Sequence, residues 1–333
     1  MNATRFPAIV TRFADQRILV IGDLMLDEFI WGRVLRISPE APVPVVDVTS
    51  ESYYPGGAAN VARNVREFAA RTSVMGITGT GPHGARLADL LHQCGIDTAG
   101  VQQDPSSFTT VKTRIIARHQ QVVRVDRERR EPLTPVQEQR AIDYLESAIE
   151  HLDGIVVSDY CKGFLTQTLA DRISALVQKH GKVLTVDPHP HNLLRWTGAA
   201  AIKPNRIEAF QAAGIRGGPP GADPLRDGDL LEVGSRLLHQ WEARCVLVTL
   251  GEQGMILFQK DAPPYHTPTR AQTVFDVSGA GDTAIGVFTL GLAAGALPCE
   301  AAELANHASG IVVGKLGTAT VTSAELLASF SAP

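Results

Sequence analysis

Cysteine is scarce in this sequence, since the 333 residues contain only four cysteines. They are Cys94, Cys161, Cys245 and Cys299. No two of them stand at the CxxC spacing of zinc and redox motifs, which argues against a cysteine-based zinc site and against a disulfide framework. Isolated cysteines of this kind are typical of proteins in the reducing cytosol, so we expect a cytoplasmic protein.

An excess of positive charge is also absent, because 31 Lys and Arg residues stand against 35 Asp and Glu residues and give a formal net charge of −4. Proteins that bind nucleic acid or anionic membranes usually present a basic face, so we expect neither partner. A membrane-spanning run is missing too. The most apolar late stretch, residues 283–297, is too short to cross a bilayer and contains three glycines. We interpret it as a buried helix.

Hydrophobic residues make up 44% of the sequence, enough for a large core. Apolar runs rich in β-branched residues alternate with amphipathic stretches of helical spacing. This alternation predicts an α/β protein with a mainly parallel central sheet flanked by helices, whose active site lies at the carboxyl ends of the strands. The predicted strands are 18–22, 43–48, 74–78, 155–158, 183–187, 200–203 and 246–249, and the predicted helices are 59–68, 85–92, 136–152 and 169–179.

One region departs from this alternation. Residues 109–128 predict two extended segments around a polar turn at 119–121. With residues 43–48 they could form a small antiparallel sheet outside the main one. Such a sheet could act as a lid or as a dimer contact. Because an edge sheet with apolar residues needs cover, we expect a homodimer through the lid.

The sequence contains no GxxxxGK[ST] motif, which excludes a P-loop. The best alternative for binding phosphate is Gly279-Ala280-Gly281, followed by Asp282 and a helical pattern. Two glycines let successive backbone N–H groups point into one concavity, and the helix start adds partial positive charge. An Asp just beyond suits the base that takes the proton of an acceptor hydroxyl. The alternative for the same residues is a glycine turn with Asp282 as a helix N-cap.

Three further segments accompany this turn. They are Gly56-Gly57 with Asn60 and Asn64, Lys203-Pro204-Asn205 with Glu208, and the strand-end turn from Thr249 through Gly251 to Gly254. In this order, and with residues 276–282, they resemble the ribokinase family, the PfkB carbohydrate kinases. The resemblance runs from residue 18 to about residue 320, and it implies a ribokinase-like fold, ATP as phosphate donor and Mg²⁺ as cofactor.

The resemblance also implies roles for individual residues. Asp282 would be the general base, with Gly279, Ala280 and Gly281 forming the anion hole. Asn205 and Glu208 would organise the magnesium–phosphate cluster, Glu208 through water. Asp187 would assist the magnesium, and Asp276 would help hold a monovalent cation such as K⁺. Thr249, Gly251 and Gly254 would line the nucleotide groove, and Asn306 or His307 would lie beside the adenine.

The acceptor side rests on Asp27, which falls where relatives bind substrate hydroxyls, and on Gly56, Gly57, Asn60 and Asn64. Residues 29–45, 158–163 and 314–320 look like the heptose-7-phosphate kinases of lipopolysaccharide core synthesis. These enzymes phosphorylate the anomeric hydroxyl of D-glycero-D-manno-heptose 7-phosphate, giving the β-1,7-bisphosphate of the ADP-heptose route. The alternatives are a ribokinase-type kinase for another sugar or nucleoside, and a catalytically silent sensor.

A sugar phosphate as partner requires cations away from Asp282. The candidates are Arg33, Lys112, Arg114, Arg118, Arg124 and Lys162. If the segment that contains Lys112, Arg114 and Arg118 is a strand, these three side chains would share one face of it. The alternative for this group is a solvated edge guarded by charge.

Bifunctional relatives carry a nucleotidyltransferase domain after the kinase, whereas this sequence ends soon after the kinase pattern. We therefore expect a single kinase domain over residues 1–333, with lid segments near 43–48 and 109–128 and no nucleotidyltransferase domain.

Overall fold

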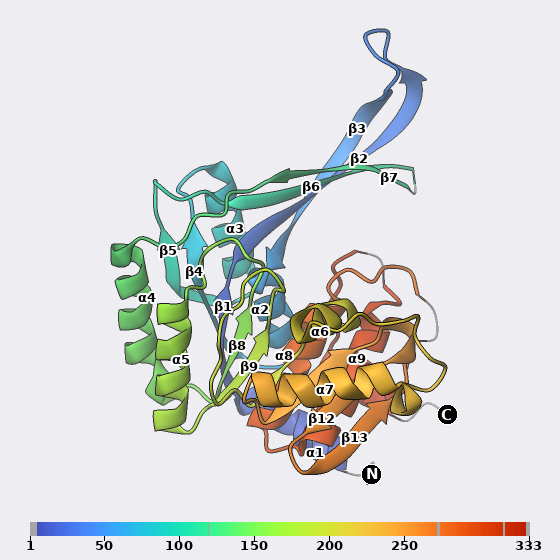
Figure 1. Cartoon of the computed structure of the whole chain (residues 1–333). Helices are drawn as coiled ribbons and strands as arrows, with labels where there is room; N and C mark the ends of the chain where they lie inside the picture. Colours follow the sequence, from blue (N-terminus) through green and yellow to red (C-terminus); the bar gives the residue numbers. More distant parts are fainter. Residues whose placement is uncertain (1–4, 119, 272–273, 316, 331–333) are drawn as a thin grey trace.

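The computed structural model describes residues 5–118, 120–271, 274–315 and 317–330. They form a nine-stranded sheet covered by helices, from which a second, four-stranded sheet projects (Figure 1). The predicted α/β fold, with a mainly parallel central sheet and a small separate sheet, is therefore confirmed.

The strands of the large sheet lie in the order β13-β12-β11-β10-β9-β8-β1-β4-β5. The pairings from β11 to β5 are parallel, and those of β12 with its two neighbours are antiparallel. Because parallel strands end at one edge of the sheet, the residues that follow them meet there. The strands are β1 (Arg17–Gly22), β4 (Arg71–Thr78), β5 (Asp97–Gln103), β8 (Gly154–Ser158), β9 (Val183–Asp187), β10 (Ala201–Ile202), β11 (Cys245–Thr249), β12 (Met255–Gln259) and β13 (Ala262–Thr267).

Helices cover both faces of this sheet. The helices are α1 (Arg5–Thr11), α2 (Ala58–Arg66), α3 (Pro82–Gln93), α4 (Pro135–Ala148), α5 (Gln167–His180), α6 (Arg206–Ala213), α7 (Gly228–Gln240), α8 (Ala280–Ala293), α9 (Pro298–Val312) and α10 (Ser323–Ser329). Strand β1 shows why both faces need cover, because its side chains alternate and the four from Ile18 to Ile21 are all apolar and buried. Ile18 and Val20 join the core that includes α2 and α8, whereas Leu19 and Ile21 join the core of α4 and α5.

Helix α8 is the buried helix that residues 283–297 predict. Its residues Asp282–Gly291 are all buried, and α2 and α9 pack on it. Close packing depends on glycine here, since a Cβ on Gly291 would lie 2.9 Å from the Cβ of Ala301. Within the described part of the chain, no helix is long and apolar enough to cross a membrane.

The smaller sheet, which we call the lid, has the strand order β3-β2-β6-β7. Its strands are β2 (Leu24–Ile37), β3 (Pro44–Gly57), β6 (Thr110–Ala117) and β7 (Gln120–Arg127). The outer pairings are antiparallel, and the central β2–β6 pairing is parallel. Figure 1 shows the β2–β3 hairpin reaching far from the body. The two predicted lid segments lie in this sheet, although His119 in the predicted turn is outside the described residues.

The sequence prediction leaves out β2, β5 and the β12–β13 hairpin. In β2, the adjacent apolar residues Phe29, Ile30 and Trp31 hide the two-residue period, because the outer half of this long hairpin is exposed on both faces. Strand β13 contains two prolines, which an edge strand tolerates because one side of its backbone has no partner strand.

Candidate active site

Asp282 lies in the first turn of α8 and is buried, near the carboxyl ends of the parallel strands. Its Oδ2 accepts a hydrogen bond of 2.7 Å from Nδ2 of Asn60, in α2. Its Oδ1 accepts one of 2.9 Å from the hydroxyl of Tyr160, in the loop after β8. The N-cap of α8 is Gly279, so the alternative of Asp282 as a helix N-cap is wrong.

Burial raises the pKa of Asp282, while the bonds from Asn60 and Tyr160 and the charge of Lys203 lower it. The net direction is upward. A carboxylate with a raised pKa is a stronger base toward a hydroxyl proton, provided that it is ionised.

The glycine turn before Asp282 presents free backbone donors. Gly279 has a φ of 81°, a conformation that favours glycine, and it turns the chain into α8. Among the described residues, the N–H groups of Gly279, Gly281 and Asp282 have no backbone or side-chain acceptor, whereas Ala280 N–H donates to Val277 O at 3.3 Å. Three donors thus remain for an anion, and the predicted donor Ala280 is engaged within the turn.

Lys203, which follows β10, brings a positive charge to this turn. A Cβ on Gly281 would lie 3.6 Å from Lys203 Nζ. The same ammonium forms an ion pair of 3.0 Å with Asp187, at the end of β9. Burial raises the pKa of Asp187 to about 7, against the lowering effect of Lys203. Asp159 nearby behaves alike, with a pKa raised to about 7 chiefly by burial.

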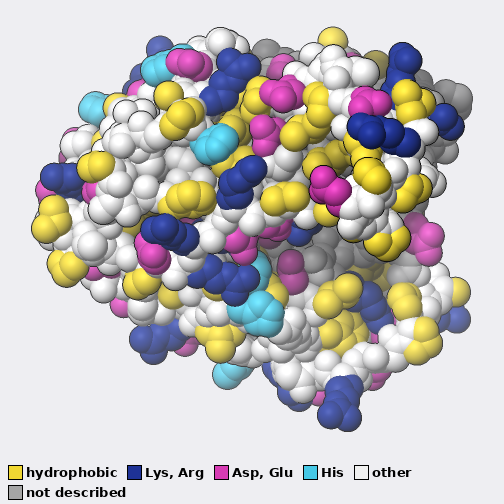
Figure 2. Space-filling view, turned by 90° about the horizontal axis from the view of Figure 1, so that it is seen from above, with side chains coloured by type: hydrophobic (Ala, Val, Ile, Leu, Met, Phe, Trp, Pro, Cys, Tyr) yellow, Lys and Arg dark blue, Asp and Glu magenta, His cyan; other side chains and the backbone are white. Residues whose placement is uncertain are grey.

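A cavity of about 550 Å³ joins these groups to the predicted nucleotide residues. Its lining includes Asp159, Tyr160, Asp187, Lys203, Asn205, Glu208, Thr249, Gly251, Gly279, Gly281 and Asp282. These residues come from segments far apart in the sequence and meet at the carboxyl ends of the parallel strands. Figure 2, seen from above, shows acidic and basic side chains interspersed over this end of the molecule.

Asn205 and Glu208 meet as a capping box at the start of α6. Asn205 Oδ1 accepts from Glu208 N–H at 3.0 Å, and Glu208 Oε2 accepts from Asn205 N–H at 2.8 Å. The Asn205 amide nitrogen and the second Glu208 oxygen remain for the cavity. The described residues contain no group of three or more His, Cys, Asp and Glu side chains that could hold a metal. A magnesium ion would therefore need ligands from phosphates and water, as is usual in kinases.

Two predicted nucleotide residues stand apart from the cavity lining. A Cβ on Gly254 would lie 2.2 Å from Thr267 O, so this glycine allows close backbone packing at β13. Asn306 Nδ2 donates to Thr267 Oγ1 at 2.9 Å and to Pro268 O at 2.6 Å, which fastens α9 to the end of β13. The alternative adenine residue, His307, is buried against Phe330 with ring centroids 3.9 Å apart.

On the acceptor side, Asp27 is buried in β2 and forms an ion pair with Arg114 of β6. Gly56 makes room for it, because a Cβ there would lie 2.6 Å from Asp27 Oδ2. Gly57, with a φ of 57°, turns the chain from β3 into α2. Both predicted glycines thus have a steric reason to be glycine.

Asn64 lies behind Asn60 rather than beside it, which corrects the expectation that Asn64 belongs to the acceptor side of the site. Its Nδ2 donates to Asn60 O at 2.9 Å, and its Oδ1 accepts from Thr283 Oγ1 at 2.8 Å. Asn64 therefore ties α2 to α8 and holds Asn60 in position.

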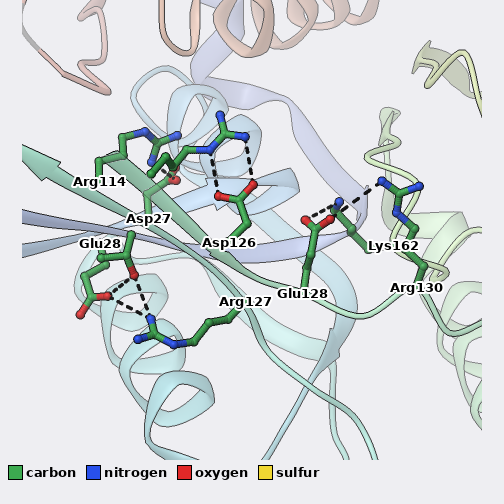
Figure 3. Close-up of polar contacts among 10 residues, drawn as sticks. Asp27, Glu28, Arg114, Asp126, Arg127, Glu128, Arg130 and Lys162 are labelled. Atoms are coloured by element: carbon green, nitrogen blue, oxygen red, sulfur yellow. Dashed lines mark hydrogen bonds and ion pairs between the residues drawn. The ribbon is translucent and has the colours of Figure 1, made fainter. Parts of the chain in front are cut away.

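The candidate cations separate into three groups. Figure 3 shows Arg114 directed at Asp27 and Lys162 at Glu128. Arg124 is paired with Asp126 through two bonds of 2.8 and 2.9 Å. These three cations are thus neutralised by carboxylates.

Arg33 and Arg118 form the second group, at the outer part of the lid. They line a separate cavity of about 520 Å³ together with Trp31 and Ile116, and no residue lines both this cavity and that of Asp282. Arg118 has a φ of 60° in the β6–β7 turn, so the expectation that it shares a strand face with Lys112 and Arg114 is wrong.

Lys112 alone forms the third group. Its ammonium lies 5.4 Å from the ring centroid of Tyr160. It has no carboxylate partner within 4 Å in the described part of the chain. Burial lowers the pKa of this lysine, and Asp27 opposes that effect. Lys112 thus connects the lid to the surroundings of Asp282.

Asp276 accepts a bond of 2.9 Å from Ser278 N–H, and its own N–H donates to Val313 O at 3.2 Å. Its carboxylate stabilises the connection that leads to the glycine turn, and it does not line the cavity of Asp282. Residues 272–273 and Leu316, the latter within the motif 314–320, lie outside the described residues.

The family model described as pfkB family carbohydrate kinase matches residues 15–325. The chain belongs to the pfkB family. The predicted membership and the assignment as a carbohydrate kinase are thus confirmed.

This pfkB-family kinase is 44% identical over 312 residues to the bifunctional protein HldE of Geobacter sulfurreducens, covering 93% of the chain and 62% of the relative. It is 43% identical over 320 residues to the protein of that name from Desulfatibacillum aliphaticivorans, covering 96% of the chain and 64% of the relative. The chain therefore spans less than two thirds of the length of these curated relatives.

Solved structures agree on the fold of this pfkB-family kinase. Arabidopsis thaliana ribokinase complexed with ribose and ATP superimposes with a TM-score of 0.71 at 17% identity, covering 96% of this chain and 99% of that one. Escherichia coli phosphofructokinase-2 in complex with substrates and products gives 0.73 at 20% identity, covering 95% and 98%. At these identities the likeness establishes the ribokinase-like fold.

Tyr160 and Lys203 are two residues of this site to which sequence reasoning assigned no role. Both stand in motifs that it quoted, 158–163 and 203–208. The available signal was their position, because Lys203 directly follows β10 and Tyr160 is the second residue after β8, at the end of the sheet where the site lies.

Proposed function

We propose that this kinase transfers the γ-phosphate of ATP to the anomeric hydroxyl of D-glycero-D-manno-heptose 7-phosphate, giving the β-1,7-bisphosphate. The observation that carries the proposal is the pairing of a buried, doubly bonded Asp282 with free N–H donors at the start of α8. The choice of sugar is supported by the 44% identity to a bifunctional protein HldE and by the heptose-kinase motifs in the sequence.

The donor side stabilises the phosphoryl group in transit. The N–H groups of Gly279, Gly281 and Asp282 and the ammonium of Lys203 supply positive charge where the transferred group gathers negative charge. In this proposal, the nucleotide lies along the cavity wall that contains Asn205, Thr249 and Gly251.

Mg²⁺ fits this cavity, because Asp159 and Asp187 both have a pKa raised to about 7 and Glu208 adds to the raised pKa of Asp187. Crowded carboxylates of this kind favour a cation between them. Asp187 and Glu208 would hold the ion with phosphates and water, and bound Mg²⁺ neutralises phosphate charge. Asp276 is the candidate for a monovalent cation such as K⁺.

On the acceptor side, Asp27 accepts sugar hydroxyls and Asp282 removes the proton from the attacking one. Asn60 Oδ1 is buried without a hydrogen-bond partner among the described residues, so a ligand O–H would satisfy it. Lys112 is the cation that we propose for the substrate phosphate, since Arg114, Arg124 and Lys162 are already paired with carboxylates.

The pairing of those three cations also favours a second candidate, a kinase for an unphosphorylated sugar. ADP release with heptose 7-phosphate, fructose phosphates, ribose and adenosine separates the two. The proposal predicts that heptose 7-phosphate gives the highest kcat/KM. A higher value with ribose or adenosine would overturn the proposed acceptor.

We also propose a homodimer formed through the lid. Large apolar side chains are exposed there, among them Leu35 at 70% and Ile37 at 62% exposure. An exposed apolar sheet surface of this kind favours burial against a second copy.

A further inference from the structure

Tyr160 lies in the site but has no role in the proposed reaction as described above. Its side chain is half-buried and lines the cavity, and its hydroxyl donates to Asp282 Oδ1 at 2.9 Å. Burial and the neighbouring carboxylates raise the pKa of Tyr160 well above its usual value. The phenol therefore keeps its proton and acts as the donor, which requires the carboxylate of Asp282 to accept.

This bond has a geometric consequence for Asp282. Asn60 holds Oδ2 and Tyr160 holds Oδ1, so the carboxylate is fixed from two elements that are 100 residues apart in the sequence. Each carboxylate oxygen can accept two hydrogen bonds. The remaining lone pairs are available to an acceptor hydroxyl, in an orientation that the two donors set.

Tyr160 is itself held from both sides. The carboxylate of Asp23, buried at the end of β1, accepts the backbone N–H of Tyr160 at 2.9 Å, of Lys162 at 3.0 Å and of Phe164 at 3.2 Å. Over the ring lies the ammonium of Lys112, from lid strand β6. The loop and the lid thus fix where the hydroxyl points.

The charged groups around Asp282 come from several neighbouring elements. Lys203 after β10 favours its ionised form, whereas Asp27 of β2 disfavours it. Asp187 of β9 interacts with Asp282 and with Glu208 of α6. Since carboxylates surround the site and burial opposes charge, the donors Asn60 and Tyr160 are needed to favour ionised Asp282.

We propose that Tyr160 is a positioning residue, which orients the carboxylate of Asp282 and keeps it ionised for proton removal from the acceptor. The inference rests on the proposed role of Asp282 as the base, and not on which sugar is the acceptor.

The test is Tyr160→Phe, which removes the hydroxyl and keeps the ring. The measurement is kcat/KM for the acceptor as a function of pH. The acidic limb of this pH profile reports the ionisation of Asp282 in the free enzyme. Loss of the donor raises the pKa of Asp282, so the limb moves to higher pH by about one pH unit. The KM for ATP stays unchanged, because the nucleotide residues Asn205, Thr249 and Gly251 are untouched.

Tyr265→Phe is the matched control, since the hydroxyl of Tyr265 also donates to a carboxylate, that of Glu303 at 2.5 Å, away from the cavity. It leaves the limb unmoved. A Tyr160→Phe enzyme with an unshifted limb, whether fully active or equally impaired at every pH, would overturn the inference. Both variants are measured with the best acceptor of the wild type, so failure of heptose 7-phosphate as substrate remains a separate result.

Discussion

At the scale of single residues, the site is an assembly of carboxylates whose charges oppose one another. Asp159, Asp187 and Asp282 all have a raised pKa, and burial is the first cause in each case. One buried ammonium, that of Lys203, lies among them. Such a site is stabilised by whatever brings positive charge, which in a kinase is the metal that accompanies the nucleotide.

Asp159 gives a prediction about stability. Its pKa is about 7 in the folded protein and close to 3.8 when unfolded, so the folded state binds the extra proton between these values. Stability of the ligand-free protein therefore falls as pH rises from about 4 to about 7. In Asp159→Asn this contribution disappears, and thermal melting between pH 5 and pH 7 shows a smaller decline than in the wild type. An equal decline in both proteins would contradict the prediction.

The residue scale also shows what the sequence could and could not predict. Asp282 and its glycine turn are one local motif, so their neighbourhood was predictable. Tyr160 and Asp282 are 122 residues apart, and only the fold brings them together. Asn64 was misplaced because spacing on a helix puts Asn60 and Asn64 on one face but does not show that Thr283 of α8 takes the Asn64 side chain.

At the scale of elements, the register of the lid strands does not by itself show which cations are free. Arg114 lies opposite Arg124 across β6 and β7, and Lys112 lies opposite Asp126. Asp126 nevertheless bonds Arg124, two residues along its own strand, and Asp27 bonds Arg114. A list of cations in the sequence contains no information on these pairings, so it overestimates the phosphate-binding set.

Lys112→Met therefore has a larger effect on the acceptor than changes at the outer lid. We predict that it raises the KM for heptose 7-phosphate about tenfold, the effect of losing one charge-assisted contact, while the KM for ATP is unchanged. Arg118→Met is the matched control, because Arg118 lines the separate cavity near Trp31. Equal effects of the two substitutions would rule out Lys112 as the specific phosphate contact.

At the scale of the whole molecule, the lid is a long sheet that joins the body at one end and projects from it (Figure 1). Strand β7 is exposed along its entire length, and the hairpin β2–β3 carries exposed apolar residues beyond the body (Figure 1). A lid of this shape requires a surface to cover it. In the dimer that we propose, a second copy would bury both lids.

Charges placed on the lid should separate the copies. We predict that Leu35→Asp with Ile37→Asp shifts the protein toward the monomer mass of 35.7 kDa, measured by light scattering after size exclusion. Leu193→Asp, at a residue that is 82% exposed outside the lid, leaves the mass as in the wild type. A wild-type protein that is already monomeric at micromolar concentration would contradict the dimer.

We propose that Asp282 is the base of a heptose-7-phosphate kinase, and the Asp282→Asn variant removes that base. Asparagine keeps the shape and the bond from Tyr160, so the fold and the KM for ATP are retained. We predict that ADP release with heptose 7-phosphate falls by about a hundredfold to ten-thousandfold, the usual contribution of a general base. An Asp282→Asn enzyme that releases ADP at the wild-type rate with this sugar would contradict the account.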